Sequence, residues 1–127
     1  MISLSKRLKI SHGNDKFLEV GVADRPGKRV LGLMFRKVRR DYGLLFPFSH
    51  ERRWSIWMPF VPQDLAVFWL DEKREVVDKK IARKISLDPD TWKTYKPEEE
   101  CKYVLECHKE KIDEIDIGDK LEWDRDG

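Results

Sequence analysis

Two charged residues beside apolar blocks are the first candidates for chemistry. Arg36 follows Leu33-Met34-Phe35, and Asp64 precedes the wholly apolar stretch 65–70. A charge at the edge of a dry core is costly unless it is paired or hydrogen-bonded. An arginine can satisfy a carboxylate through a two-pronged contact. We therefore expect Arg36 and Asp64 to approach each other, either as a structural ion pair or at the rim of a recognition site.

The segment from Trp57 to Asp64 is where the sequence predicts a pocket. Pro59 and Pro62 forbid regular strand pairing there, because proline has no backbone N–H to donate. In an enzyme, a carboxylate beside such a cleft would have a shifted pKa and would act as acid or base. The candidate ligand-binding residues are Arg36, Trp57, Met58, Phe60, Asp64 and Glu106.

Metal, disulfide and nucleophile chemistry have little support in the spacing. Cys101 and Cys107 would lie ~20 Å apart in one strand, at ~3.3 Å per residue, whereas a disulfide needs Cα atoms within ~7 Å. The three histidines form no triad-like or zinc-like spacing with other residues. The seven glycines are isolated and form no phosphate-binding loop. We predict no metal and no cofactor.

Aromatic and basic residues together raise the possibility of nucleic-acid binding. Five tryptophans and the basic run 36–40 resemble the stacking platforms and positive grooves of single-strand binders. However, 26 Lys and Arg face 24 Asp and Glu, so the chain lacks the strongly basic footprint of such proteins. We therefore expect only non-specific affinity for oligonucleotides, ~10⁻⁴–10⁻⁶ M.

The charges are segregated along the chain. Residues 1–40 hold eleven basic and three acidic side chains, and residues 98–127 hold five basic and twelve acidic ones. These ends either attract each other in the fold or mark two surfaces for partners. Asn14 and Gln63 are the only side-chain amides beside abundant Lys and Glu. This composition is typical of thermophilic proteins.

Length and hydropathy predict one cytoplasmic domain over residues 1–127. A chain of 127 residues is long enough to bury a core without metals or disulfides. It contains no run of ~20 apolar residues that would span a membrane. The basic residues near the N-terminus are not followed by the apolar stretch of a signal peptide.

Short alternating segments and turn signals predict a mostly β domain, either a small β-barrel or a rolled sheet. Two short helices are expected, at 24–33 and 109–115, with a long loop over 86–97. Strands are expected at 2–10, 18–22, 42–46 (ended by Pro47), 53–58, 65–70, 76–85, 102–107 and 121–123. Inward positions predict a core that contains Val20, Leu33, Phe35, Leu45, Ile56, Val67, Trp69 and Leu105.

Five apolar blocks, in order, also carry a family resemblance. They are Gly32-Leu33-Met34-Phe35-Arg36, Gly43-Leu44-Leu45-Phe46-Pro47-Phe48, Trp54-Ser55-Ile56-Trp57-Met58, Asp64-Leu65-Ala66-Val67-Phe68-Trp69-Leu70-Asp71 and Lys102-Tyr103-Val104-Leu105-Glu106. From about Val20 to Leu121 the chain resembles the domain-of-unknown-function 192 family, also called uncharacterised protein family 0127. The resemblance implies a single β-barrel-like domain.

The chain departs from this family at one place. Members that it resembles usually carry Lys-Asn-Thr after the Trp-Met pair, whereas this chain has Pro59-Phe60-Val61-Pro62-Gln63-Asp64. A function carried by that polar cluster would be altered here.

We therefore expect a non-catalytic module that binds a small ligand or another protein. The alternatives are a hydrolase or transferase whose site assembles in space, and a nucleic-acid-binding barrel. The sequence does not identify the ligand or fix the oligomeric state.

Overall fold

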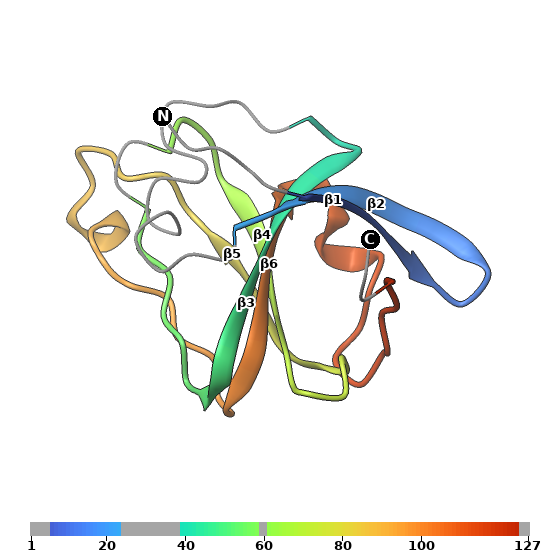
Figure 1. Ribbon diagram of the computed structural model, residues 1–127. Coiled ribbons are helices and arrows are strands. Elements are labelled where there is room, and N and C mark those ends of the chain that lie inside the picture. The colour runs from blue at the N-terminus through green and yellow to red at the C-terminus, as the bar shows by residue number, and fades with distance from the viewer. Residues whose placement is uncertain (1–5, 24–38, 59–60, 125–127) are drawn as a thin grey trace.

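The structure is a computed structural model that describes residues 6–23, 39–58 and 61–124. Strands account for about half of these residues, and the helical turns are short 3-10 turns, as Figure 1 shows. The elements are β1 (Lys6–His12), β2 (Asp15–Val22), β3 (Tyr42–Arg52), β4 (Leu65–Leu70), β5 (Val76–Ala82), η1 (Pro89–Thr91), β6 (Cys101–His108) and η2 (Lys109–Asp113).

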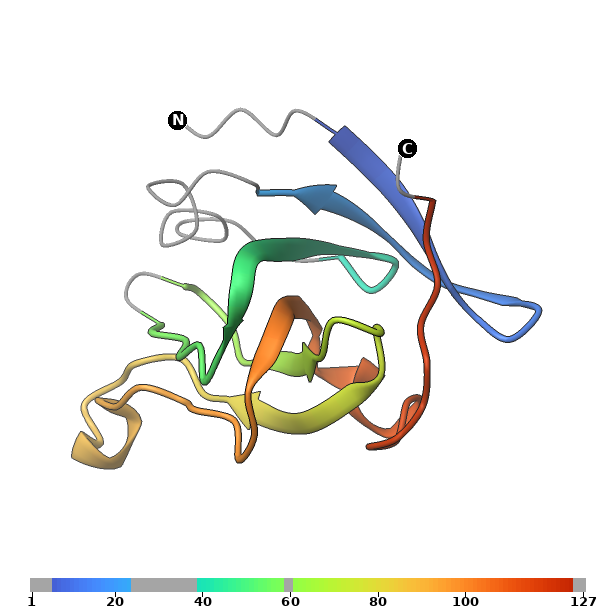
Figure 2. The ribbon, with the colours of Figure 1, turned by 60° about the horizontal axis from the view of Figure 1, so that its bottom comes forward.

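The six strands form one mixed sheet in the order β1-β2-β3-β6-β4-β5. β2 and β3 are parallel, and every other neighbouring pair is antiparallel. The sheet curls strongly without closing, and the β1–β2 hairpin crosses over β3 (Figure 2). The prediction of a mostly β, rolled-sheet domain is confirmed, and the sheet is not a closed barrel.

The central strands are buried on both faces, which explains their sequence pattern. In β4, Ala66, Phe68 and Leu70 belong to one hydrophobic cluster, while Leu65, Val67 and Trp69 belong to the other. Side chains of a strand alternate between faces, so an apolar residue is needed at every position. The predicted bounds of this strand, 65–70, are confirmed.

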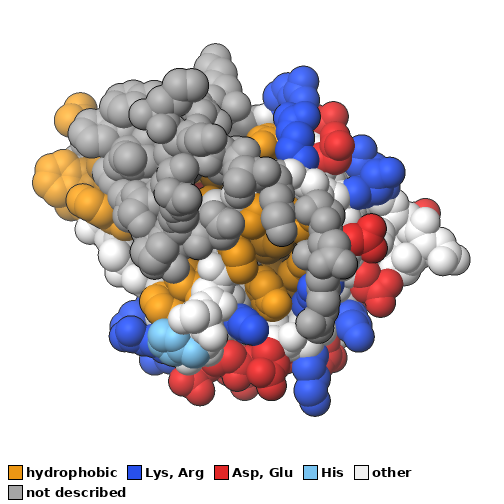
Figure 3. Space-filling view, in the orientation of Figure 1, with side chains coloured by type: hydrophobic (Ala, Val, Ile, Leu, Met, Phe, Trp, Pro, Cys, Tyr) orange, Lys and Arg blue, Asp and Glu red, His pale blue; other side chains and the backbone are white. Residues whose placement is uncertain are grey.

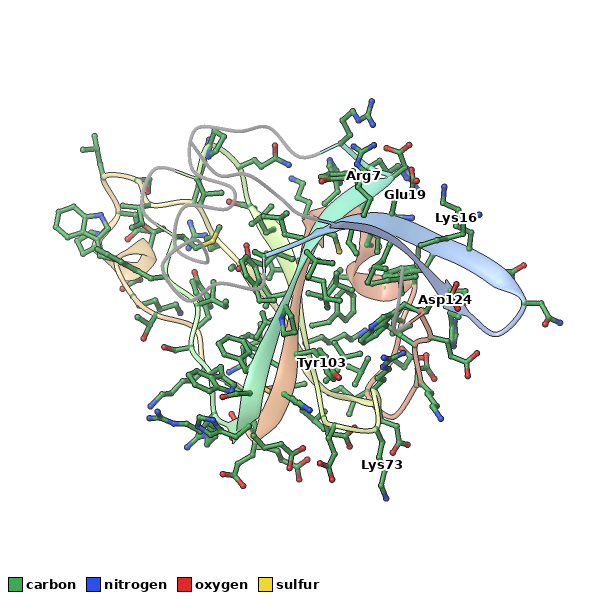
Figure 4. All side chains as sticks on the ribbon, viewed as in Figure 1. Arg7, Lys16, Glu19, Lys73, Tyr103 and Asp124 are labelled. Atoms are coloured by element: carbon green, nitrogen blue, oxygen red, sulfur yellow. The ribbon has the colours of Figure 1, made fainter. Side chains whose placement is uncertain are left out.

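The β1–β2 hairpin covers the first cluster with one face and presents charge on the other. Leu8, Ile10, Leu18 and Val20 are buried. Arg7, Lys16 and Glu19 project from the outer side (Figure 4), and Lys16 lies 4.0 Å from Glu19. The turn uses Gly13, whose φ of 63° lies in the left-handed region that glycine tolerates.

Pro47 does not end β3, contrary to the prediction. β3 continues to Arg52, with an irregularity in its pairing to β6 between Pro47 and Arg52. β2 pairs with β3 only as far as Leu45. Among the described residues, one side of β3 is therefore unpaired beyond that point, and a proline is compatible with such an edge.

The predicted strands 53–58 and 121–123 are wrong. Ile56 exchanges two 2.8 Å backbone hydrogen bonds with Tyr95, and Ser11 exchanges two of 2.9 Å with Glu122, but each is an isolated bridge. Both segments pack against the sheet instead of extending it, so the alternation of Trp54, Ile56 and Met58 marks a covering segment. β5 also ends at Ala82, before the predicted Ile85.

The remaining elements follow the prediction closely. The expected helix at 109–115 is the 3-10 turn η2, and the expected loop 86–97 contains only the short turn η1. The expected helix at 24–33, with the core positions Leu33 and Phe35, lies outside the described residues. Ile56 is partly buried against the second cluster. The other predicted core residues are buried: Val20, Leu45, Val67, Trp69 and Leu105.

Close approach of β3 to β6 requires glycine at position 43. A Cβ atom there would lie 2.5 Å from the backbone oxygen of Glu106 and 3.1 Å from the Cβ of Cys107. Both strands are held by their ladder, so neither backbone can move aside without losing hydrogen bonds. Gly43 therefore fixes the separation of the two central strands.

We expect Val67→Ala to lower the free energy of unfolding by about 1–3 kcal/mol, from lost apolar burial and the cavity left behind. Urea unfolding measures this change. Leu87, which is 96% exposed, provides the control, and Leu87→Ala should leave stability unchanged. Equal stability of Val67→Ala and the wild type would show that β4 is misplaced.

We expect Gly43→Ala to lower stability by about 1–3 kcal/mol, because the new methyl group overlaps the β6 backbone. Leu87→Ala is again the control, because Leu87 is 96% exposed. The control should change stability by less than about 0.5 kcal/mol. An unaffected Gly43→Ala variant would contradict the close β3–β6 approach.

Candidate functional site

A buried carboxyl group in the middle of the sheet is the centre of the candidate site. Glu106 lies on β6 opposite Leu44 of β3 and Val67 of β4. Both partners belong to the second hydrophobic cluster, so the side chain of Glu106 is on that face. Only 6% of the residue is exposed. A carboxyl group in such surroundings is costly and needs an explanation.

A cavity of about 270 Å³ connects Glu106 to the surface. Among the described residues that line it, four are aromatic and Glu106 is the only one whose side chain can ionise at physiological pH. The lining residues are Phe46, Phe48, Trp54, Ser55, Ile56, Trp57 and Glu106. The described lining is thus largely apolar, with a carboxyl and a hydroxyl group that can fix the orientation of a ligand, which is the usual make-up of a small-molecule site.

The aromatic wall is rigidly held. The rings of Phe48 and Trp54 stack with centroids 4.0 Å apart and an angle of 15° between their planes. The indole N–H of the fully buried Trp69 donates a 2.8 Å hydrogen bond to the backbone oxygen of Trp54. The paired hydrogen bonds between Ile56 and Tyr95 fix the next residues. The segment over the sheet is therefore anchored on both sides of Ser55.

Burial raises the pKa of the Glu106 carboxyl from its ordinary value of 4.5 to about 8. Among the described residues, no hydrogen bond or ion pair involves this carboxyl group. Desolvation penalises the charged form, and no described neighbour offsets that penalty. Glu106 is accordingly protonated at neutral pH. It can donate one hydrogen bond as an acid, or accept several once ionised.

Arg52 is the cation nearest to the described lining, and it lies over Trp54 on the outside of the cavity. The guanidinium carbon of Arg52 lies 5.0 Å from the ring centroid of Trp54. The ring of His50 meets the same indole edge-on, with centroids 5.3 Å apart. Arg52 and His50 are exposed, so solvent screens their charge from the cavity.

The structure brings together two of the six predicted site residues. Trp57, which is 57% exposed, and the buried Glu106 line the same cavity. Met58 is fully buried in the second cluster. Asp64 faces a different hollow, and its Oδ1 accepts a 2.8 Å hydrogen bond from the backbone N–H of Lys84. Arg36 and Phe60 lie outside the described residues, so the Arg36–Asp64 pairing remains a prediction.

Five lining residues were not among the predicted site residues. Phe46 and Phe48 lie two apart on β3, a spacing that puts both side chains on one face of a strand. This signal was present, but the expected end of the strand at Pro47 separated them. Ser55 and Ile56 join the cavity because the segment 53–58 covers the sheet. Trp54 also lines it, although its position favoured the core, and it is partly buried.

A larger groove, of about 690 Å³, is a seam between chain segments. Its side chains carry both signs of charge, and they include Lys73 at the β4–β5 turn and Asp124 near the end of the chain (Figure 4). The guanidinium of Arg74 lies 3.9 Å from the ring centroid of Trp123 and donates a 2.6 Å hydrogen bond to its backbone oxygen. These contacts hold the C-terminal segment against the sheet. The groove is therefore the junction between packed chain segments, and we do not assign it a ligand.

Both cysteines are buried and free. Burial raises the pKa of Cys101 to about 11, and burial also raises the pKa of Cys107. Neither thiol is therefore activated as a nucleophile. Within the described ranges, no three His, Cys, Asp or Glu side chains gather as metal ligands. Among these residues, no helix has the length and apolar character needed to cross a membrane.

Charge on the visible face of the molecule is concentrated away from its apolar centre. Hydrophobic side chains gather in the middle of this face, and charged ones follow its lower edge (Figure 3). One residue of the basic stretch 1–40 contacts the acidic stretch 98–127. The guanidinium nitrogens of Arg40 lie 2.8 Å from a carboxylate oxygen of Glu110 and 3.9 Å from one of Glu114. The segregated charges of the sequence therefore attract each other, at least at this point of the fold.

Comparison with known proteins gives consistent sequence matches. The model of the family described as "Uncharacterized ACR", domain of unknown function 192, matches residues 8–123. An uncharacterised protein family 0127 member from Pyrococcus furiosus is 34% identical over 120 residues, which cover 93% of this chain and 97% of the relative. One from Thermococcus gammatolerans is 34% identical over 127 residues, which cover 98% and 75%. These archaea are thermophilic, in agreement with the composition.

Two crystal structures share the fold. One, from Sinorhizobium meliloti, is named as a proposed transcription regulator; it has a TM-score of 0.79 and 22% identity and covers 97% of each chain. The other, a protein of unknown function from Novosphingobium aromaticivorans, has a TM-score of 0.74 and 20% identity and covers 92% of this chain and 84% of its own. At these identities the likeness concerns the fold alone.

The raised pKa of Glu106 predicts a specific pH dependence of stability. The folded chain retains the proton up to about pH 8, whereas the unfolded chain releases it near pH 4.5. The free energy of unfolding of the wild type should therefore fall, relative to that of Glu106→Gln, as pH rises through this window. The slope is at most about 1.4 kcal/mol per pH unit. Urea titrations of both proteins across the window measure it, and parallel curves would contradict the buried, unpaired carboxyl.

Proposed function

We propose that the chain, which belongs to the domain-of-unknown-function 192 family of uncharacterised proteins, binds a small ligand in the cavity at Glu106. The supporting observation is the buried carboxyl at the base of an aromatic-lined cavity. This favours the small-ligand form of a binding module over a protein-binding one, because the polar group lies inside a concave site.

A purely structural role explains Glu106 poorly. The other buried acidic side chain, Asp78, accepts 2.8 Å and 2.9 Å hydrogen bonds from the backbone N–H groups of Lys79 and Glu98. Asp64 likewise accepts one from Lys84. These acids hold backbone segments in place. Glu106 holds no described segment, and replacing a buried polar group by an apolar one of similar shape is often neutral or stabilising. Retaining it is therefore understandable if it contacts a ligand.

An enzyme is a less economical explanation of the same cavity. Ser55 and Glu106 are the lining residues with a hydroxyl or carboxyl group. A protonated carboxyl can act as a general acid, but a nucleophile activated by a neighbouring base needs a second titratable group in contact. The described lining supplies shape, one hydroxyl group and one carboxyl group, which is sufficient for binding.

Nucleic acid fits the described surface less well. Arg39 lies 3.8 Å from Asp41, and Arg40 is paired with Glu110 and Glu114. A phosphate would have to compete with these carboxylates. The name of the Sinorhizobium meliloti neighbour concerns that protein, and the shared fold brings no contact residues to this chain.

The proposal is tested with three small probes that fit the cavity by size: benzyl alcohol, choline and its uncharged carbon analogue 3,3-dimethylbutan-1-ol. Binding is followed by two-dimensional NMR of the tryptophan indole N–H groups. We expect at least one probe to shift the indole signals of Trp54 and Trp57 saturably, because both rings line the cavity.

Trp57→Ala and Trp92→Ala form a matched pair of variants. Both tryptophans are largely exposed, at 57% and 63%, so neither change should unfold the protein. Trp57→Ala should weaken binding by at least about tenfold, from lost apolar contact area. Trp92→Ala should bind like the wild type, because Trp92 is not among the lining residues. The proposal fails if no probe binds, or if both variants bind equally.

A further inference from the structure

We propose that the natural ligand of this cavity is an organic cation, an amine or quaternary ammonium, for which Glu106 is the counter-ion and the aromatic side chains are the enclosing wall. The inference rests on the proposed function and specifies the chemistry of the ligand. It is carried by the combination of one buried acidic group with four aromatic rings around a single cavity.

The first argument is charge complementarity. Within the described lining, Glu106 is the one residue that can ionise, and its environment strongly resists a lone negative charge. A cation that enters the cavity offsets this cost, because two opposite charges in a water-poor site attract far more strongly than in water. An anionic ligand would instead meet a group that can only become more negative. A neutral ligand would receive a hydrogen bond from the protonated acid and would make no use of its ability to ionise.

The second argument is the chemistry of the wall. Aromatic faces carry partial negative charge and attract cations within about 6 Å of the ring centroid. Phe46, Phe48 and Trp57 supply such rings, whereas the faces of Trp54 are taken by the stacked Phe48 ring and by the Arg52 guanidinium. The cluster already holds one organic cation of the chain, because the Arg52 guanidinium lies over the Trp54 ring on the outside. A cavity for a purely apolar ligand would not need a carboxyl group at its base.

The third argument concerns the groups that face Glu106. On the same side of the sheet, β3 presents Leu44 and Phe46, and β4 presents Val67 and Trp69. The titratable members of this cluster are Tyr95 and Cys101, and the pKa of Cys101 is itself raised by burial. Cys107, next in sequence, points to the opposite cluster. Arg52 and His50 lie at the exposed edge beyond Trp54, and the described part of β3, β4 and β6 places no cation against Glu106.

Cation binding should therefore be coupled to loss of a proton. At neutral pH the empty cavity holds Glu106 as a neutral acid, with a pKa of about 8. A bound cation favours the carboxylate, and the proton leaves to solvent. Affinity for a permanently charged ligand should rise with pH, by up to about tenfold per pH unit below this pKa. Choline is suitable because its ammonium charge does not titrate.

The experiment compares choline with 3,3-dimethylbutan-1-ol, which has the same shape with carbon in place of the charged nitrogen. Isothermal titration calorimetry at about pH 6 and about pH 9 gives both affinities, and buffers of different ionisation enthalpy report the proton released. We expect choline to bind at least about tenfold more tightly at pH 9 than at pH 6. Binding at about pH 6 should release a proton. Affinity for the alcohol should be independent of pH.

Glu106→Gln keeps the size of the side chain and removes its charge. In this variant choline should lose its preference over the alcohol, its pH dependence and its proton release. Glu98→Gln is the control, because the Glu98 side chain is 79% exposed and lies outside the cavity. It should behave like the wild type. If Glu106→Gln does not fold, the pH dependence of the wild type still decides the question.

The outcomes separate the inference from the function on which it rests. Binding of the alcohol as tight as that of choline, at both pH values, would overturn the cation and leave the pocket as a ligand site. A choline preference that Glu106→Gln retains would overturn Glu106 as the counter-ion. Absence of binding by every probe would overturn the proposed function itself.

Discussion

The antiparallel pairing of β6 with both β3 and β4 is the interaction on which the rest of the structure depends. It makes β6 the inner strand of the curled sheet, with Val104 and Leu105 in opposite hydrophobic clusters. Gly43 allows β3 to approach until its Cα faces the backbone oxygen of Glu106. Because the ladder fixes the strand on both edges, the Glu106 side chain has one direction available, into the second cluster. From there the side chain enters the cavity beneath residues 54–57, so only 6% of Glu106 is exposed.

Burying the Glu106 carboxyl group costs free energy, and no hydrogen bond or ion pair from a described residue offsets this cost. Other charged groups near the core are satisfied: Lys79 donates to the backbone oxygens of Ile112 and Ile115 at 2.8 Å and 3.0 Å, and Lys111 donates to that of Phe17 at 3.1 Å. These lysines close the ends of a turn and of a strand, so their charges contribute to stability. Glu106 differs from them in kind, since it is directed into a cavity and its burial favours the protonated form. Lys79 and Lys111 thus hold backbone segments of the fold together, whereas Glu106 makes no such contact among the described residues.

The sequence predicted the strands better than it predicted the site. The stretch 65–70 was recognised with correct bounds because a strand covered on both faces must be apolar throughout. Pro47 was misleading because its effect depends on whether the strand has an open edge, which is a property of the sheet and not of the local sequence. The segment 53–58 has the alternation of a strand, yet forms only one bridge at Ile56. Glu106 and Trp57 were both candidates, but their proximity depends on the register of β6 against β3 and on the path of a covering segment. Neither can be derived from spacing.

The place where the chain departs from its family bears on the cavity in a specific way. Among the described residues, those that line the cavity are Glu106 and residues at positions 46–57, which precede the altered segment 59–64 or lie on another strand. That segment is anchored on both sides by apolar burial, with Met58 fully buried and Val61 8% exposed. The backbone N–H of Val61 also donates to the oxygen of Met58 at 3.5 Å. Polar side chains are therefore not required to hold the end of the covering segment in place. The described carboxyl and aromatic side chains of the cavity therefore come from β3, β6 and residues 54–57, and not from the positions at which the chain departs from the family that it resembles.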